Sequence, residues 1–228
     1  HEIACVVARA FFGEDIEPDV LDEIVKDTLL SFDTPVVHVD DNIYSLELFH
    51  GPTLAFKDVG ARFMARTLGY FIRKKGLRQV NVLVATSGDT GSAVANGFLG
   101  VPGIHVYVLY PKGKVSPIQE CQFTTLGQNI TALEIDGNFD DCQALVKAAF
   151  MDEALNKHMT LTSANSINVA RFLPQAFYYF NAYAQLDRQG KADQLVVCVP
   201  SGNFGNITAG LFAYWMGLPI KRFVAANN

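Results

Sequence analysis

The sequence predicts an α/β fold with parallel sheets covered by helices, and three observations lead to this prediction. Apolar, strand-like runs alternate with segments of helical periodicity along most of the chain, which is the pattern of parallel strands joined by helices. Two polar, glycine-rich turns, at residues 86–91 and 201–206, each join an apolar strand to a helix, where ligands bind in such folds. Half of the 228 residues are apolar and only 18% are charged, which excludes a disordered chain.

The first 75 residues are expected to be mainly helical, with two strands in between. Pro18 suits the first turn of a helix, and apolar residues then recur at helical spacing as far as Leu29. Asp33-Thr34-Pro35 ends this region, because the residue before a proline avoids helical geometry. The elements expected next are strands at 36–39 and 44–49 and a helix at 57–75, with Gly76 as its stop.

From residue 80 onward, strands and helices alternate regularly. The near-continuous apolar run at 80–85 is typical of a strand buried on both faces. Pro111 ends a later strand, and Pro174 interrupts a long helix. The expected strands are 80–85, 104–110, 130–135, 161–164, 195–199 and 222–226, and the expected helices are 92–99, 116–126, 139–150, 167–186 and 207–216.

Composition and charge disfavour several classes of protein. The net charge is −5, and Arg73-Lys74-Lys75 is only a short basic run, so we expect no nucleic-acid partner. No apolar run approaches the ~20 residues that span a bilayer and no signal peptide is visible at His1, so we expect no membrane partner and a cytoplasmic location. The four cysteines are far apart and the five histidines lack ligand spacing, so we expect reduced, mostly buried thiols and no metal.

A lysine in an unusual setting is the first candidate for chemistry. The segment 50–58 places Lys57 at the start of a helix, behind the turn Gly51-Pro52 and among apolar neighbours. A helix N-terminus carries about half a positive charge, which disfavours a cation there. A lysine kept neutral in this way suits a Schiff base or a general base. An ordinary solvated lysine is an equally good interpretation.

Both glycine-rich turns are predicted to bind anions. Ser201-Gly202-Asn203-Phe204-Gly205-Asn206 follows an apolar strand that we expect to be buried and precedes a helix, so its backbone N–H groups could surround a phosphate. Thr86-Ser87-Gly88-Asp89-Thr90-Gly91 adds hydroxyl groups that suit a carboxylate. The alternatives are a plain turn for the first and a helix cap by Thr or Ser for the second.

Two further segments follow predicted strands and are weaker candidates for phosphate binding. Lys112-Gly113-Lys114 could reach a phosphate, although solvated lysines are the default interpretation. The segment 163–171 ends at Arg171, whose guanidinium could bind phosphate with two hydrogen bonds. Capping by Ser166 and a surface position for Arg171 are an equal alternative.

Three motifs together resemble one enzyme family. They are Leu48-Phe49-His50-Gly51-Pro52-Thr53-Leu54-Ala55-Phe56-Lys57-Asp58, Ala85-Thr86-Ser87-Gly88-Asp89-Thr90-Gly91 and Pro200-Ser201-Gly202-Asn203-Phe204-Gly205-Asn206. In this order they are similar to the threonine synthase family, pyridoxal-phosphate enzymes of the tryptophan-synthase-β-like fold (fold type II). The resemblance covers nearly the whole chain, and the length of the first motif makes it highly specific.

The resemblance implies two α/β lobes, each with a mainly parallel sheet covered by helices. Residues 1–35 would be part of an N-terminal helical cap, 36–78 and 190–228 the larger cofactor-binding lobe, and 79–189 a smaller inserted lobe. The missing Met at position 1 and a last strand without a covering helix lead us to expect a chain incomplete at both ends. The residue that faces the pyridine nitrogen of the cofactor is then expected beyond Asn228.

The resemblance also assigns roles to individual residues. Lys57 would hold pyridoxal 5'-phosphate as a Schiff base, and Gly202, Asn203, Phe204, Gly205 and Asn206 would surround its phosphate. Thr86, Ser87, Gly88, Asp89 and Thr90 would receive the α-carboxylate of the substrate, with Asp89 turned toward its amine or a backbone amide. The candidates for the substrate phosphate are Lys114, Asn165, Ser166, Asn168 and Arg171.

The implied reaction converts O-phosphohomoserine and water to L-threonine and phosphate, with Lys57 moving the α-proton. The small-molecule substrate O-phosphohomoserine is the only expected partner. A related phospho-lyase would use the same residues but release 2-oxobutyrate, ammonia and phosphate. A non-catalytic binding module is a third interpretation, which the intact Lys57 and both glycine-rich turns disfavour.

Overall fold

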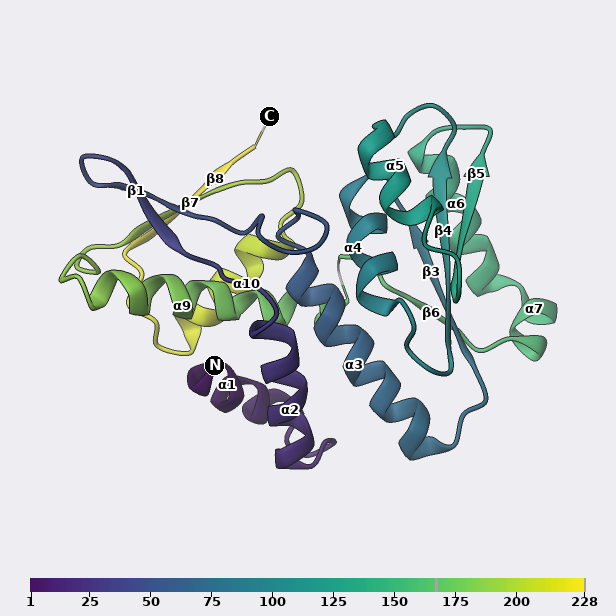
Figure 1. Ribbon diagram of the computed structural model, residues 1–228, viewed down its shortest axis with the longest axis horizontal. Helices are drawn as coiled ribbons and strands as arrows, with labels where there is room; N and C mark the ends of the chain where they lie inside the picture. Colours follow the sequence, from purple (N-terminus) through teal and green to yellow (C-terminus); the bar gives the residue numbers. More distant parts are fainter. Residues whose placement is uncertain (167, 228) are drawn as a thin grey trace. The chain divides into compact units, whose positions relative to one another are not determined.

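The computed structural model describes residues 1–166 and 168–227, and the chain divides into two compact units (Figure 1). Unit 1 consists of His1–Gly60 and Phe172–Asn228, and unit 2 is the inserted stretch Ala61–Arg171. The predicted lobes divide the chain at 78/79 and 189/190 instead. The two helices at the junctions, α3 (Asp58–Lys75) and α9 (Ala176–Asp187), explain the difference, because α3 packs mostly in the core of unit 2 and α9 in that of unit 1.

Unit 2 is a four-stranded parallel sheet with helices on both faces. The strands are β3 (Val80–Ala85), β4 (Ile104–Pro111), β5 (Ile130–Ile135) and β6 (Leu161–Ser163), in the order β5-β4-β3-β6. Every neighbouring pair is parallel, and every residue of β3 is buried. Both observations confirm the predicted parallel α/β arrangement and the strand buried on both faces.

Alternate residues along the strands of unit 2 face two separate hydrophobic cores, as the period of a strand requires. On one face Val82 and Val84 pack with α3, α4 (Asp89–Phe98) and α5 (Pro117–Thr124). On the other face Leu83 and Ala85 pack with α6 (Phe139–Met151), which α7 (Glu153–His158) follows. The sheet therefore lies between two helical layers, and the loops at the carboxyl ends of its strands are where ligands bind in such folds.

Unit 1 is built mainly from helices around two small sheets. α1 (Glu2–Phe12) and α2 (Pro18–Leu29) precede an antiparallel hairpin of β1 (Val36–Asp40) and β2 (Ile43–Leu46). After α9, strand β7 (Val196–Pro200), α10 (Gly205–Trp215) and β8 (Arg222–Ala226) follow, and β7 pairs with β8 in parallel. The core of this unit joins residues from three of its parts, among them Val59, Tyr178 and Ala209.

An ion pair joins the first two helices of unit 1. Arg9 on α1 contacts the carboxylate of Asp22 on α2. The hydrogen bond from Arg9 holds the pKa of Asp22 below its ordinary value. Both side chains are exposed enough that solvent screens the pair, so its contribution to stability is small.

The sequence predicts every described strand to within a few residues and the break at Pro174, but not α1 or α7 as separate helices. At Pro174 the chain forms α8 (Val169–Phe172), a short 3-10 helix η1 (Leu173–Gln175) and then α9, because proline cannot continue the hydrogen bonding of an α-helix. The predicted start of this helix, Ile167, lies outside the described residues.

Two predictions about burial need correction. Strand β7 was expected to be buried, but it alternates between exposed and half-buried residues, because its one partner among the described strands is β8. The cysteines were expected to be mostly buried, but only Cys5 and Cys142 are, while Cys121 and Cys198 are exposed. All four are free thiols.

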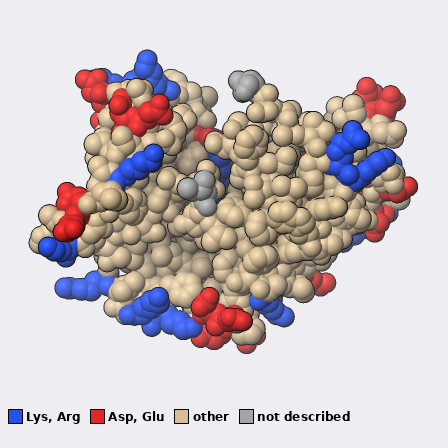
Figure 2. Space-filling view, turned by 180° about the vertical axis from the view of Figure 1, so that it is seen from behind, with Lys and Arg blue, Asp and Glu red and all other residues tan. Residues whose placement is uncertain are grey.

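The described surface carries charges of both signs. On the face shown in Figure 2, basic and acidic side chains lie in small mixed groups, and no continuous basic area is visible among the described residues. Within residues 1–166 and 168–227 no helix is both long and apolar enough to cross a membrane. The described His, Cys, Asp and Glu side chains form no group suited to a metal ion.

Candidate active site

Lys57 occupies the position directly before α3, as the sequence predicts. Its side chain is half-buried, and Nζ lies 5.5 Å from the centroid of the Phe56 ring. The chain reaches Lys57 through a tight turn, in which the Leu54 N–H donates to the Gly51 carbonyl oxygen and the Asp58 N–H to that of Ala55, both at 3.1 Å. The lysine thus projects from a turn with a fixed backbone rather than from a loose loop.

Asp58, the first residue of α3, holds this turn closed. Its carboxylate accepts the backbone N–H of Thr53 at 3.1 Å and the Thr53 hydroxyl at 2.5 Å, and Asp58 is only 1% exposed. A carboxylate at a helix N-terminus is also favoured by the helix dipole. Gly51 is required beside it, since a Cβ there would lie 2.4 Å from Asp58 Oδ2.

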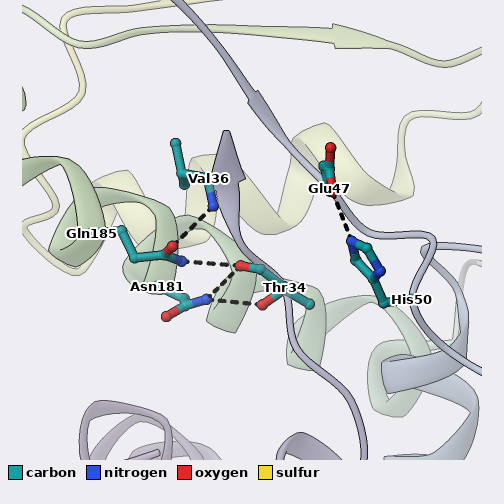
Figure 3. A network of polar contacts seen from close by, with 6 residues as sticks. All are labelled: Thr34, Val36, Glu47, His50, Asn181 and Gln185. Carbon is teal, nitrogen blue, oxygen red and sulfur yellow. Dashed lines mark hydrogen bonds and ion pairs between the residues drawn. The ribbon is translucent and has the colours of Figure 1, made fainter. Parts of the chain in front are cut away.

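The segment before this turn is also held by hydrogen bonds (Figure 3). His50 Nε2 lies 2.7 Å from Glu47 Oε2. Further back, two side chains of α9 hold the link between α2 and β1. Asn181 Nδ2 donates to the Thr34 hydroxyl at 2.8 Å, and Gln185 accepts the Val36 N–H at 2.9 Å.

The second glycine-rich turn leads into α10. Residues 202–204 are exposed, and the Ser201 hydroxyl donates to the Asn203 carbonyl oxygen at 2.9 Å. Helix α10 begins at Gly205, so the first N–H groups of the helix have no partner within it. None of the described residues accepts a hydrogen bond from the backbone N–H groups of residues 202–206. This set of donors at the positive end of a helix fits a phosphate group.

The side chain of Asn206 is directed into the protein rather than toward solvent. Asn206 is 8% exposed, its Oδ1 lies 2.7 Å from the Tyr179 hydroxyl, and its Nδ2 donates to Gln175 Oε1 at 3.0 Å. The backbone N–H of Asn206, and not its amide group, is therefore the part that could face a phosphate.

Unit 1 thus contains both a lysine in a fixed turn and a set of phosphate-binding donors. Val59, next to the turn, and Ala209 and Ala213 of α10 belong to the same hydrophobic core. A primary amine and a phosphate cradle carried by one folded unit are the groups that a phosphorylated aldehyde requires. The residues present therefore fit such a cofactor.

In unit 2, Thr86 supports its own turn. The Thr86 hydroxyl accepts the N–H groups of Gly88 at 3.0 Å and Gly91 at 2.8 Å, and Thr86 is 1% exposed. Both glycines are needed, because a Cβ at Gly88 would lie 2.4 Å from Gln119 Oε1 and one at Gly91 would lie 2.5 Å from Thr86 Cγ2. The hydroxyl of Thr86 shapes the turn, and its role toward a substrate stays a prediction.

The other residues of this turn differ in exposure. Ser87 is exposed, Gly88 is buried, and Asp89 and Thr90 are half-buried in the first turn of α4. The backbone of Gly88 precedes that helix and has a φ of +155°. Contacts of Ser87, Gly88, Asp89 and Thr90 with a carboxylate stay a prediction.

The predicted substrate-binding residues of unit 2 follow neighbouring strands of its sheet. Thr86 follows β3, Lys114 follows β4, and Asn165 follows β6. These strands are parallel neighbours, so the three loops lie at the same edge of the sheet. Lys114 is exposed, and Asn165 and Ser166 are half-buried.

Arg171 does not lie on the surface, so that alternative is wrong. It is 1% exposed, and its Nη1 donates to the Ala164 carbonyl oxygen at 2.5 Å. Asn168 lies beside it, where its Nδ2 donates to the Ser163 carbonyl oxygen at 3.1 Å. Both side chains hold the loop after β6, because a buried polar group needs hydrogen-bond partners. Contact with a phosphate stays a prediction for both.

Sequence reasoning assigned no role to four residues that hold the lysine turn and the phosphate cradle. They are Asp58, Gln175, Tyr178 and Tyr179. The signal for Asp58 was its position at a helix N-terminus directly after Lys57. Gln175 lies in η1 and the two tyrosines lie in α9, and their partners are too far along the chain to be predicted from local pattern.

Comparison with known proteins identifies the family of the chain. Residues 28–228 match the family model described as "Pyridoxal-phosphate dependent enzyme". The chain is 54% identical over 97% of its length to threonine synthase from Escherichia coli (strain K12), covering 51% of that protein. It thus spans about half the length of the curated relatives it matches.

Two solved structures share the fold at high similarity. A threonine synthase from Escherichia coli superposes with a TM-score of 0.89 at 53% identity, over 99% of this chain and 51% of the other. A PLP-bound threonine synthase from Brucella melitensis gives a TM-score of 0.88 at 41% identity, over 97% and 48%. With the family model matching from residue 28 to residue 228, the chain belongs to the family of pyridoxal-phosphate dependent enzymes.

Proposed function

We propose that the protein converts O-phosphohomoserine and water to L-threonine and phosphate, with pyridoxal phosphate as its cofactor. The observation that carries the proposal is the pairing, within unit 1, of Lys57 in its fixed turn with the donor-rich start of α10. The relatives named threonine synthase supply the substrate class. The cytoplasm is the proposed compartment, in keeping with four free cysteines.

The cofactor would be held at its two ends. Lys57 Nζ would bind its aldehyde carbon covalently, and the N–H groups of Gly202, Asn203, Phe204, Gly205 and Asn206 would bind its phosphate at the positive end of α10. When bound, pyridoxal phosphate supplies an acceptor for the electrons released at the α-carbon of an amino acid.

The residues of the chain would then bind the substrate and move its protons. Ser87, Gly88 and Thr90 would bind the α-carboxylate, supported by the turn that Thr86 shapes, and Asp89 would face the amine or a backbone amide. The Lys57 amine would take the α-proton and return protons at the end of the reaction. The β-carbon would also lose a proton, the γ-phosphate would leave with the electrons of its C–O bond, and the γ-carbon would take up a proton to become the methyl group. Water would then add its OH at the β-carbon and give its remaining proton to the departing phosphate.

Cationic and amide donors would stabilise the leaving phosphate. Lys114 is exposed and directly available for this role. Asn165 and Ser166 would contribute from the loop after β6, which Asn168 and Arg171 hold in place. We propose a small-molecule substrate as the only partner that the reaction requires.

The test is a product assay with the full-length protein, pyridoxal phosphate and O-phosphohomoserine. The proposal expects threonine and phosphate in equal amounts, with no 2-oxobutyrate. Lys57→Ala should abolish both products, because the α-proton then has no acceptor. Release of 2-oxobutyrate and ammonia would instead show a phospho-lyase, and no turnover by the wild-type protein would contradict an enzymatic role.

A further inference from the structure

Two adjacent tyrosines of α9 contact the two halves of the proposed cofactor site. Tyr178 and Tyr179 are 2% and 6% exposed. Adjacent residues of a helix point about 100° apart, so one helix can direct them to two different neighbours. The neighbours here are the lysine turn and the start of α10, both in unit 1.

Tyr178 holds the backbone of the lysine turn. Its hydroxyl donates to the Phe56 carbonyl oxygen at 2.5 Å. That carbonyl belongs to the peptide group that joins Phe56 to Lys57, so the hydrogen bond fixes the plane from which the Cα of Lys57 extends. With Asp58 bound to Thr53 on the other side, Lys57 is held by residues before and after it.

Tyr179 holds the start of α10. Its hydroxyl lies 2.7 Å from Asn206 Oδ1 and 3.0 Å from the Asn206 carbonyl oxygen. Burial raises the pKa of Tyr179, so the hydroxyl stays protonated and donates. Gln175 completes the arrangement by accepting from Asn206 Nδ2 at 3.0 Å. Every polar atom of the Asn206 side chain is thereby paired.

The helices α9 and α10 also meet closely at this point. A Cβ at Gly210 would lie 2.5 Å from Cε1 of Tyr179, so the glycine lets the tyrosine ring lie directly against α10. Ring packing and hydrogen bonding by the same tyrosine leave α10 little freedom to slide or rotate along α9.

We infer that Tyr178 and Tyr179 are positioning residues that make α9 the common support of Lys57 and the phosphate cradle. Each hydroxyl fixes one end of the cofactor site. Because both tyrosines belong to α9, this helix sets the distance from the lysine amine to the phosphate cradle. This inference rests on the proposed cofactor. It predicts that the two hydroxyls act on different ends of that cofactor, which a general role in stability would not produce.

The experiment separates the two ends with two probes. Pyridoxamine 5'-phosphate has no aldehyde and reports on the phosphate cradle, while pyridoxal has no phosphate and reports on bond formation with Lys57. The full-length protein is compared as wild type, Tyr178→Phe and Tyr179→Phe. Tyr183→Phe is the matched control, because Tyr183 packs on the same core from α9 and its hydroxyl bonds to none of the described residues.

The expected result is a crossed pattern. Tyr179→Phe should weaken pyridoxamine 5'-phosphate binding about tenfold, since it removes the donor to the buried Asn206 Oδ1, and should leave the rate of bond formation with pyridoxal within about twofold. Tyr178→Phe should slow bond formation with pyridoxal about tenfold and leave pyridoxamine 5'-phosphate binding within about twofold. Tyr183→Phe should change neither.

Two results would overturn the inference while leaving the proposed function intact. In the first, both variants bind pyridoxamine 5'-phosphate and react with pyridoxal as the wild type does. In the second, both variants lose phosphate-probe affinity and pyridoxal reactivity to the same extent. If Tyr179→Phe does not fold, Gln175→Met replaces it. This variant should weaken pyridoxamine 5'-phosphate binding by less than tenfold. Binding as tight as in the wild type would contradict the inference. A wild-type protein that binds neither probe contradicts the proposed cofactor itself.

Discussion

The carboxylate of Asp58 accepts two hydrogen bonds from Thr53, one from its N–H at 3.1 Å and one from its hydroxyl at 2.5 Å. This pair closes the turn whose last residue is Lys57. The fixed position of the lysine therefore depends on two hydrogen bonds between residues on either side of it.

Asp58→Asn should loosen this turn. An amide offers only one acceptor oxygen, so a donor of Thr53 would face the NH₂ group and lose its bond. We expect the free energy of unfolding to fall by about 1–3 kcal/mol, measured by urea denaturation of the full-length protein. Thr53→Ser keeps both donors and should cost no more than the ~1 kcal/mol of a buried methyl group. Equal stability of wild type and Asp58→Asn would contradict this account.

Gly91→Ala should strain the first glycine-rich turn of unit 2. Its Cβ would lie 2.5 Å from Thr86 Cγ2, and overpacking of this kind costs roughly 1–3 kcal/mol. The double variant Gly91→Ala with Thr86→Ser removes the clashing methyl group and keeps the hydroxyl, so it should recover part of the loss. A double variant less stable than the sum of the two single changes would show that the clash is not the cause.

Tyr179 should make stability sensitive to alkaline pH. Burial raises its pKa above the value of about 10 in an unfolded chain, so above that pH the unfolded state binds fewer protons than the folded state. The contribution of the protonated Tyr179 hydroxyl to the free energy of unfolding is complete below pH 10. It is lost as the pH rises through the pKa that Tyr179 has in the folded state, by up to about 1.4 kcal/mol per pH unit. Tyr179→Phe should flatten the decline above pH 10 relative to the wild type. Parallel curves for wild type and Tyr179→Phe would refute the assignment.

Two cysteines of unit 2 should differ sharply in reactivity. Cys121 is exposed, whereas Cys142 is buried and its pKa is raised chiefly by that burial. Because the thiolate is the reactive form, iodoacetamide should label Cys121 in the native protein and Cys142 only after denaturation. Peptide mass spectrometry reads both sites in one sample. Native labelling of Cys142 at the rate of Cys121 would show that α6 does not protect it.

Local pattern was sufficient to predict the strands of unit 2. The run at 80–85 became β3 with its predicted bounds, and 130–135 became β5, because apolar periodicity and turn residues act over short stretches. It was also sufficient for Lys57 before α3 and for the glycine-rich turns at 86–91 and 201–206. In both cases the residues that specify the feature are adjacent in the sequence.

Features that depend on distant partners could not be predicted in this way. Tyr178 and Phe56 are 122 positions apart, and Tyr179 and Asn206 are 27 apart. Nothing in either segment alone names its partner. The exposure of β7 and the burial of Arg171 were missed for the same reason, since each is decided by which elements pack around it.

The central claim is that Lys57 is the residue that binds the cofactor, and covalent trapping tests it most directly. The full-length protein is loaded with pyridoxal 5'-phosphate, reduced with sodium borohydride, digested and sequenced by mass spectrometry. The account predicts a single phosphopyridoxyl group on the peptide that carries Lys57, and none in Lys57→Ala. A label on another lysine, or the same amount of label in Lys57→Ala, would contradict it.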